Sequence, residues 1–165
     1  MSETASSQLR RVQRVLYGLS ILVFLATIVE LLAAKHYDEL EQLIPFVVAF
    51  AGIVSVVAVW RMPSVWTVRG MQAFMLASAG ASLLGMYIHL SGNMEFVREI
   101  HPDASLAAAL RQGFTGRDPI LAPGVLAMAA FLALIASSLH PAPRAVDEPV
   151  ADRAATRPAR HLLMR

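Results

Sequence analysis

Four long apolar segments constrain the folding of this chain more than any other feature. About 20 residues of apolar helix are needed to cross a bilayer core that is about 30 Å thick. Four segments approach that length and carry at most one acidic residue each: 15–34, 43–60, 71–90 and 119–139. The sequence therefore predicts an all-α integral membrane protein, in which four spanning helices form a four-helix bundle over residues 15–139.

The composition supports a location in the membrane. Of the 165 residues, 56% are hydrophobic and 16% are charged, whereas soluble domains average about 45–50% apolar and about 25% charged residues. This balance excludes an ordinary soluble enzyme and a nucleic-acid-binding domain, so the expected partner is the lipid bilayer and not nucleic acid. The absence of cysteine excludes disulfides and thiolate metal sites.

The distribution of charged residues predicts how the four spans are oriented. Loops on the cytoplasmic side of a membrane carry an excess of Lys and Arg. Ten Lys or Arg and four acids fall on one side of the predicted spans, whereas four Lys or Arg and eight acids fall on the other. We therefore expect both termini to be cytoplasmic. Thirteen Arg against one Lys indicate a GC-rich bacterial genome, and hence the inner membrane of a bacterium.

Three segments lie outside the predicted spans. Residues 1–14 form a short cytoplasmic N-terminal segment. The outer loop, residues 91–118, is long for a helical bundle, and we expect it to hold one or two short amphipathic helices, over residues 94–100 and 104–112. The C-terminal segment 140–165 has four Pro, five Arg and no apolar core, which predicts a disordered basic cytoplasmic tail.

Local signals predict where these helices begin and end. The Ser-Gly-Asn sequence at residues 91–93 is expected to end the third span, and Asp103 is expected to cap the helix over residues 104–112. Asp118 followed by Pro119 predicts the start of the fourth span, because Pro is favoured in the first turn of a helix.

Small residues predict which faces of the spans pack together. Ser78, Ser82 and Gly85 share one helical stripe with His89, and small residues mark where membrane helices approach closely. We therefore expect His89 to face the interior of the bundle. The predicted packing stripes are Ala77, Ser78, Ala81, Ser82 and Gly85 in the third span and Ala129, Ala133, Ala136 and Ser137 in the fourth.

Ionisable residues near the outer ends of the spans form the candidate site. Glu30 lies in the first span and His89 at the end of the third, and an ionisable residue in a span is a functional hypothesis because burying its charge is costly. His36, Asn93 and Glu95 lie in the two outer loops. Carboxylates and imidazoles are ligands of Zn, Mn and non-haem Fe. One interpretation is therefore a site for a divalent metal ion built from these five residues.

Two other interpretations of these residues stay open. Acids accumulate in outer loops when Lys and Arg are excluded from them, so the cluster needs no function at all. Alternatively, Glu30 and His89 pass a proton between them. Glu95 and Glu99 stand four residues apart, a spacing that places both on one helix face. The sequence has no HExxH motif, EF-hand loop or paired Glu-x-x-His motif, so it does not choose among the three interpretations.

The expected function is that of an accessory or binding subunit of a membrane assembly. Its partners would be other membrane subunits or further copies of the chain, and the outer-face residues would form its ligand site. The alternative is a proton-coupled transporter of a small solute, which would act as an oligomer because four helices enclose too little volume for a pore. A membrane hydrolase that uses a bound metal ion has the least support, and no residue is assigned as catalytic.

Overall fold

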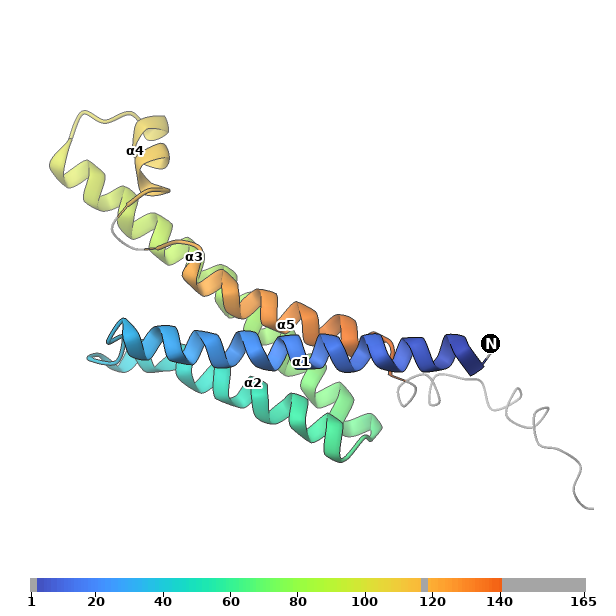
Figure 1. Cartoon of the computed structure of the whole chain (residues 1–165). Helices are drawn as coiled ribbons and strands as arrows, with labels where there is room; N and C mark the ends of the chain where they lie inside the picture. The colour runs from blue at the N-terminus through green and yellow to red at the C-terminus, as the bar shows by residue number, and fades with distance from the viewer. Residues whose placement is uncertain (1–2, 117–118, 141–165) are drawn as a thin grey trace, which may run out of the picture.

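The computed structural model describes residues 3–116 and 119–140. This part of the chain contains five α-helices, one short 3-10 helix and no strand, which confirms the predicted all-α fold. In chain order the elements are α1 (Glu3–Ala33), η1 (Leu40–Leu43), α2 (Ile44–Arg61), α3 (Val65–Ile100), α4 (Leu106–Gly113) and α5 (Ala122–Ser138) (Figure 1). The predicted disordered tail lies almost wholly outside the described residues, as does Asp118.

Three helices are long and apolar enough to cross a membrane. They are Thr4–Ala33, Leu40–Arg61 and Val65–Ile100, and they are consistent with a membrane protein. The fourth apolar helix, α5, has 17 residues, which amounts to about 26 Å and falls short of a bilayer core of about 30 Å. The structure thus supports three of the four predicted spans, and a fourth stays a prediction.

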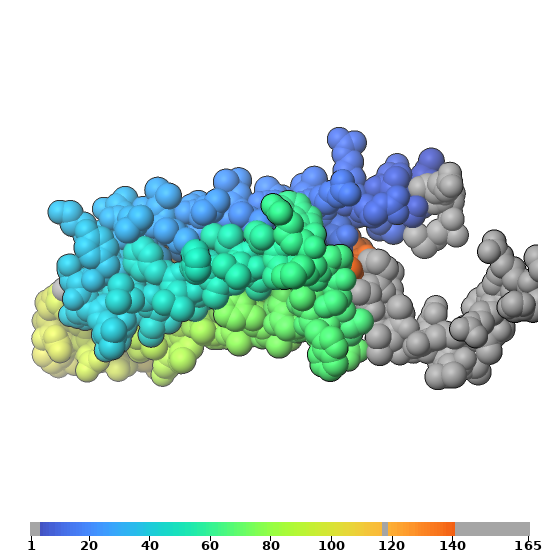
Figure 2. Space-filling model, turned by 90° about the horizontal axis from the view of Figure 1, so that it is seen from below, coloured from blue at the N-terminus to red at the C-terminus, as the bar shows by residue number. Residues whose placement is uncertain are grey.

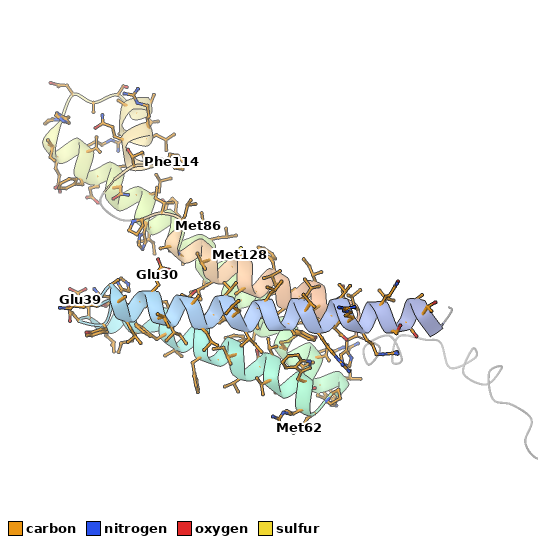
Figure 3. All side chains as sticks on the ribbon, in the orientation of Figure 1. Glu30, Glu39, Met62, Met86, Phe114 and Met128 are labelled. Atoms are coloured by element: carbon orange, nitrogen blue, oxygen red, sulfur yellow. The ribbon has the colours of Figure 1, made fainter. Side chains whose placement is uncertain are left out.

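The long helices surround a shared core in the order α1, α2, α3, α5. α1 contacts α2 and α5, and α3 contacts α2, α4 and α5, whereas α1 and α3 do not contact each other within the described residues. Figure 2 shows the same order on one face, where α2 lies between α1 and α3. We call the end at which α1 stops and α2 begins the η1 end, and the end at which α2 turns into α3 the Met62 end (Figures 1 and 3).

The contact between α1 and α2 is close because a glycine faces an aromatic ring. Phe24 is fully buried, and a Cβ placed on Gly52 would lie 2.6 Å from its Cζ. Nearer the Met62 end, the ring of Tyr17 meets Trp60 edge-on, with centroids 6.4 Å apart. Only a residue without a side chain fits opposite Phe24, so Gly52 sets the separation of the two helices.

Alanines of α5 form the centre of the core. Ala129, Ala133, Ala136 and Ser137 are all buried, which confirms the packing stripe expected for this helix. The stripe expected in α3 is correct only in part. Ser78 and Ser82 are buried together with Met71 and Met75, whereas Ala77 and Ala81 are exposed. One residue along a helix turns the side chain by about 100°, so these alanines point away from α5.

Local chemistry explains two helix starts. A capping box begins α3: the Thr67 N–H donates to Ser64 Oγ at 3.1 Å, and the Ser64 N–H donates to Thr67 Oγ1 at 2.9 Å. The start of α5 differs from the prediction, because the helix begins at Ala122 and has Pro123 in its first turn. A helix begun at Pro119 would place Pro123 where an N–H must donate to the carbonyl four residues back, and proline has none.

Side-chain hydrogen bonds join α5 to both of its neighbours. Ser20 Oγ donates to the Ala129 carbonyl at 2.8 Å, and Gln13 Nε2 donates to the Ala136 carbonyl at 3.1 Å, both from α1. From α3, Gln72 Nε2 donates to Ser137 Oγ at 2.9 Å. Polar side chains within an apolar bundle stabilise helix contacts through bonds of this kind.

Replacing Ser20 with alanine is expected to lower the free energy of unfolding by about 0.6 kcal/mol, and by no more than about 1.7 kcal/mol. The variant removes a bond between two helices. The matched control is Ser55→Ala, because Ser55 Oγ bonds only to the Gly52 carbonyl of its own helix. Unfolding measured by steric trapping in bicelles should show a larger loss for Ser20→Ala. Equal losses would contradict the interpretation.

Candidate functional site

α3 continues well past the point at which the third span was expected to end. Its 36 residues extend over about 54 Å, more than the thickness of a bilayer core. The Ser-Gly-Asn sequence at residues 91–93 lies within the helix, so the predicted break and the predicted separate helix over residues 94–100 are wrong. Asn93 and Val97 prolong the buried stripe of α3, and their packing outweighs the cost of about 1 kcal/mol for a helical glycine.

α4 folds back onto this extension of α3 (Figure 1). It corresponds to the second predicted loop helix, but Ser105 caps it in place of Asp103: the Ala108 N–H donates to Ser105 Oγ at 3.2 Å. Ala109 is buried, and so is Gly113 at the end of the helix. A Cβ on Gly113 would lie 2.8 Å from Cγ of Met94, so the end of α4 lies directly against α3.

Asn93 joins the end of α4 to α3. Its side chain is 3% exposed, and its Nδ2 donates to the Gly113 carbonyl at 2.9 Å. The backbone of Gly116 also lies against the Asn93 side chain, leaving no space for a Cβ. The amide predicted as a metal ligand therefore has a structural role, because it satisfies a carbonyl at the end of a helix.

His89 lies between two contact points on the same stripe of α3. One turn before it, Gly85 approaches Pro123 of α5: a Cβ placed on Gly85 would lie 3.1 Å from Cβ of Pro123. One turn after it, Asn93 contacts the end of α4. His89 is partly buried, and its buried Nδ1 has no hydrogen-bond partner among the residues described. Its position agrees with the predicted interior face and leaves a buried nitrogen that can accept or donate one hydrogen bond.

The remaining predicted ligands are dispersed around the η1 end. Glu30 is an exposed residue of α1 (Figure 3). His36 lies in the turn after α1, where its backbone N–H donates to the Leu31 carbonyl at 2.9 Å. Glu95 is exposed on α3, about 200° around the helix from Asn93. These side chains therefore point in different directions.

The geometry gives no support to the predicted metal site. Within residues 3–116 and 119–140, no three His, Cys, Asp or Glu side chains come close enough together to hold a metal ion. Glu30 belongs to α1, whereas His89, Asn93 and Glu95 belong to α3, and these two helices are not neighbours. The divalent metal ion and the proton path both stay predictions.

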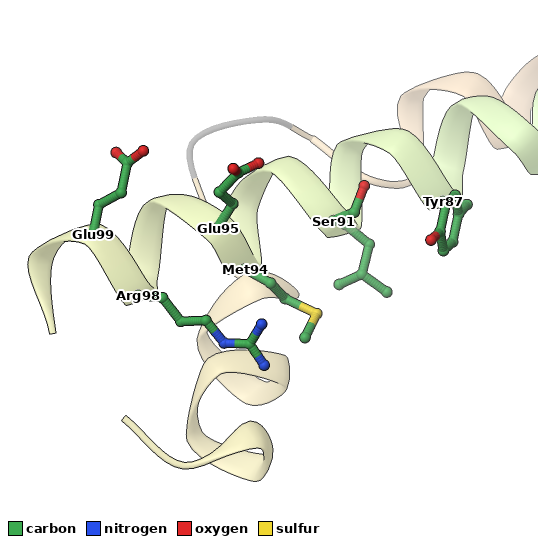
Figure 4. A pocket seen from close by; sticks show the side chains of 7 residues that line it. Tyr87, Ser91, Met94, Glu95, Arg98 and Glu99 are labelled. Carbon is green, nitrogen blue, oxygen red and sulfur yellow. The ribbon is translucent and has the colours of Figure 1, made fainter. Parts of the chain in front are cut away.

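A hollow lies on the extension of α3 at the η1 end. Its volume is about 630 Å³. Figure 4 shows Glu95 and Glu99 one turn apart on one side, with Met94 and Arg98 on the side of α4. The lining residues are Tyr87, Leu90, Ser91, Met94, Glu95, Arg98 and Glu99. The pair of acids is evident from its spacing in the sequence, whereas Arg98 and Tyr87 were not expected at this site, because the predicted helix ended between them.

The Met62 end has the opposite charge. Exposed arginines gather there from α1, α2 and α3: Arg10, Arg11, Arg14, Arg61 and Arg69. His140 follows α5 at this end, its backbone N–H donates to the Ser137 carbonyl at 2.9 Å, and burial lowers its pKa. This end therefore presents basic side chains of α1, α2 and α3, far from the acids of the hollow.

Comparisons of this chain with protein-family models, with curated proteins and with solved structures found no match. Inference about its function therefore depends on its own residues and their geometry.

Proposed function

We propose that the protein is an accessory or binding subunit of a membrane assembly, and that it binds its partner at the η1 end. The observation that carries this proposal is the hollow on the extension of α3. Two exposed acids, Glu95 and Glu99, lie there beside the exposed Arg98. Because α4 is bonded to the same stretch of α3 through Asn93, the surface is held on a rigid support, as a binding site requires.

The proposal includes a four-helix membrane bundle in the inner membrane of a bacterium, with both termini in the cytoplasm. Its support is the asymmetry of charge. The arginines of the Met62 end fit the cytoplasmic side, which places the acids of the η1 end outside. In this arrangement α5 is the fourth span, and the bilayer adapts to its shorter length by local thinning.

The charge of the hollow specifies the kind of partner. Two carboxylates and one guanidinium leave a net charge of about −1 on this surface at neutral pH. Complementary charge steers association and selects partners. The expected partner is therefore a membrane subunit whose outer segment carries a basic side chain beside an acceptor for Arg98.

The proposal is tested by reversing the charge of the hollow. The double variant Glu95→Lys, Glu99→Lys is expected to recover a specific partner about tenfold less than the wild-type chain, as measured by quantitative mass spectrometry after mild solubilisation of native membranes. The matched control is Glu39→Lys, Glu41→Lys, which makes the same change of charge on exposed residues of the first loop at the η1 end. The same partners in all three samples would overturn the proposal.

The alternative function, proton-coupled transport, predicts a different result for a variant of Glu30. A proton-coupled transporter should lose proton uptake in proteoliposomes when Glu30 is replaced by glutamine. An accessory subunit should tolerate Glu30→Gln, because Glu30 is exposed and does not line the hollow. Loss of flux in Glu30→Gln, with unchanged recovery of partners in the charge-reversal variant, would favour the transporter.

A further inference from the structure

α4 uses only part of its apolar surface against α3. Ala109 and Gly113 are buried in that contact. Leu106, Leu110 and Phe114 follow one another at intervals of four residues, so they share the adjoining side of the helix. They are 64%, 40% and 61% exposed. A row of large apolar side chains is therefore uncovered beside the buried edge of α4.

We infer that this row is embedded in the outer leaflet of the bilayer, so that α4 is an interfacial helix that lies among lipid headgroups and the upper parts of the acyl chains. The polar side of α4 agrees with this position. Arg111 and Gln112 are exposed and lie about 100–200° around the helix from Leu110. An apolar side facing the acyl chains and a basic polar side facing the headgroups are typical of interfacial helices.

The depth of α4 can be calculated along two routes from the bond between Ser20 and Ala129. Along α1, the helix ends at Ala33, about 20 Å further towards the η1 end. The second route follows α5 from Ala129 to Pro123, crosses to Gly85, and continues along α3 to Asn93. It covers about 21 Å before any tilt. Asn93, which holds the end of α4, is therefore at about the level at which α1 ends.

Exposed apolar side chains also lie on α3 and before α5, on the approach to α4. Leu83, Leu84 and Ile88 are each more than half exposed on α3, about two to three turns before Met94, which Gly113 contacts. Leu121, just before α5, is 73% exposed. Lipid would cover these side chains of the spans, and the row on α4 follows them towards the η1 end.

This inference depends on the membrane location and not on the proposed partner. The acids of the hollow lie on a different side of α3, since Glu95 and Glu99 are about 120–200° around the helix from the buried Asn93 and Val97. Binding of a partner in the hollow and of lipid along α4 are therefore separate events, and the failure of one leaves the other intact.

Tryptophan fluorescence with brominated lipid tests the inference. The chain has two Trp, Trp60 and Trp66, and both are replaced by phenylalanine in the background. Phe114→Trp then places a single reporter in the row, at an exposed aromatic position. In vesicles of phosphatidylcholine brominated near the glycerol end of one acyl chain, its fluorescence is expected to fall by about twofold or more. Bromine near the terminal methyl groups should quench it less.

Two controls make the outcome decisive. Gln112→Trp places the reporter on the polar side of the same helix, where little quenching by either lipid is expected. Leu84→Trp, on the exposed side of α3, should be quenched and so verifies insertion of the protein. If Leu84→Trp is quenched while Phe114→Trp is not, or if Phe114→Trp and Gln112→Trp are quenched equally, the inference is wrong. The first outcome would indicate a protein partner on α4.

Discussion

Replacing Gly52 with valine is expected to lower the free energy of unfolding by about 1–3 kcal/mol. Three atoms of the Phe24 ring lie within 3.0 Å of the position that a Cβ would take. The ring is fully buried, so a Cβ at Gly52 must displace core atoms, and we expect α1 and α2 to move apart. The loss would be measured as a lower unfolding free energy in bicelles.

Gly80→Val is the matched control for this prediction. Both glycines lie inside long apolar helices, so the two substitutions change helix propensity alike. No atom lies within 4 Å of a Cβ at Gly80, so Gly80→Val is expected to change stability little. Phe24→Leu should restore part of the loss in Gly52→Val, because leucine lacks the ring atoms nearest to Gly52. A similar loss in both glycine variants, with no rescue, would contradict the role given to this contact.

Replacing Asn93 with alanine is expected to release α4 from α3. The substitution removes the bond from Nδ2 to the Gly113 carbonyl, which keeps the Gly116 N–H as a partner at 3.3 Å, so the expected cost is that of one hydrogen bond, about 0.5–1.5 kcal/mol. Each 1.4 kcal/mol raises the open population about tenfold, and proteolysis follows that population. Cleavage by trypsin after Arg111 should therefore accelerate by about two- to tenfold.

The variant Gln72→Ala controls for a general loss of stability. Gln72→Ala also removes one side-chain amide bond between helices, but at the Met62 end. It is expected to leave the cleavage rate after Arg111 unchanged. If Asn93→Ala does not accelerate cleavage, or if Gln72→Ala does so equally, then Asn93 does not hold α4 in place.

The length of α3 illustrates how local signals and tertiary contacts compete. The Ser-Gly-Asn sequence at residues 91–93 has low helix propensity, and a prediction from neighbouring residues ends the helix there. The helix continues because Asn93 and Val97 are buried under α4, which is about 15 residues away along the chain. A local pattern does not contain that contact. The start of α5 is different, since Pro123 itself disfavours a helix that begins at Pro119, and that signal is present in the sequence.

The sequence by itself determined that the chain is helical, apolar and asymmetric in charge, because these properties depend on residue type and on spacing along the chain. Only the tertiary structure decided which residues of the η1 end meet. α5 and α2 separate α1 from α3, so Glu30 and His89 do not share a helix contact, whereas Glu95, Arg98 and Glu99 line one hollow. The order of helices around a core is set by packing between distant residues such as Phe24 and Gly52, and periodicity within one helix carries no information about its neighbour.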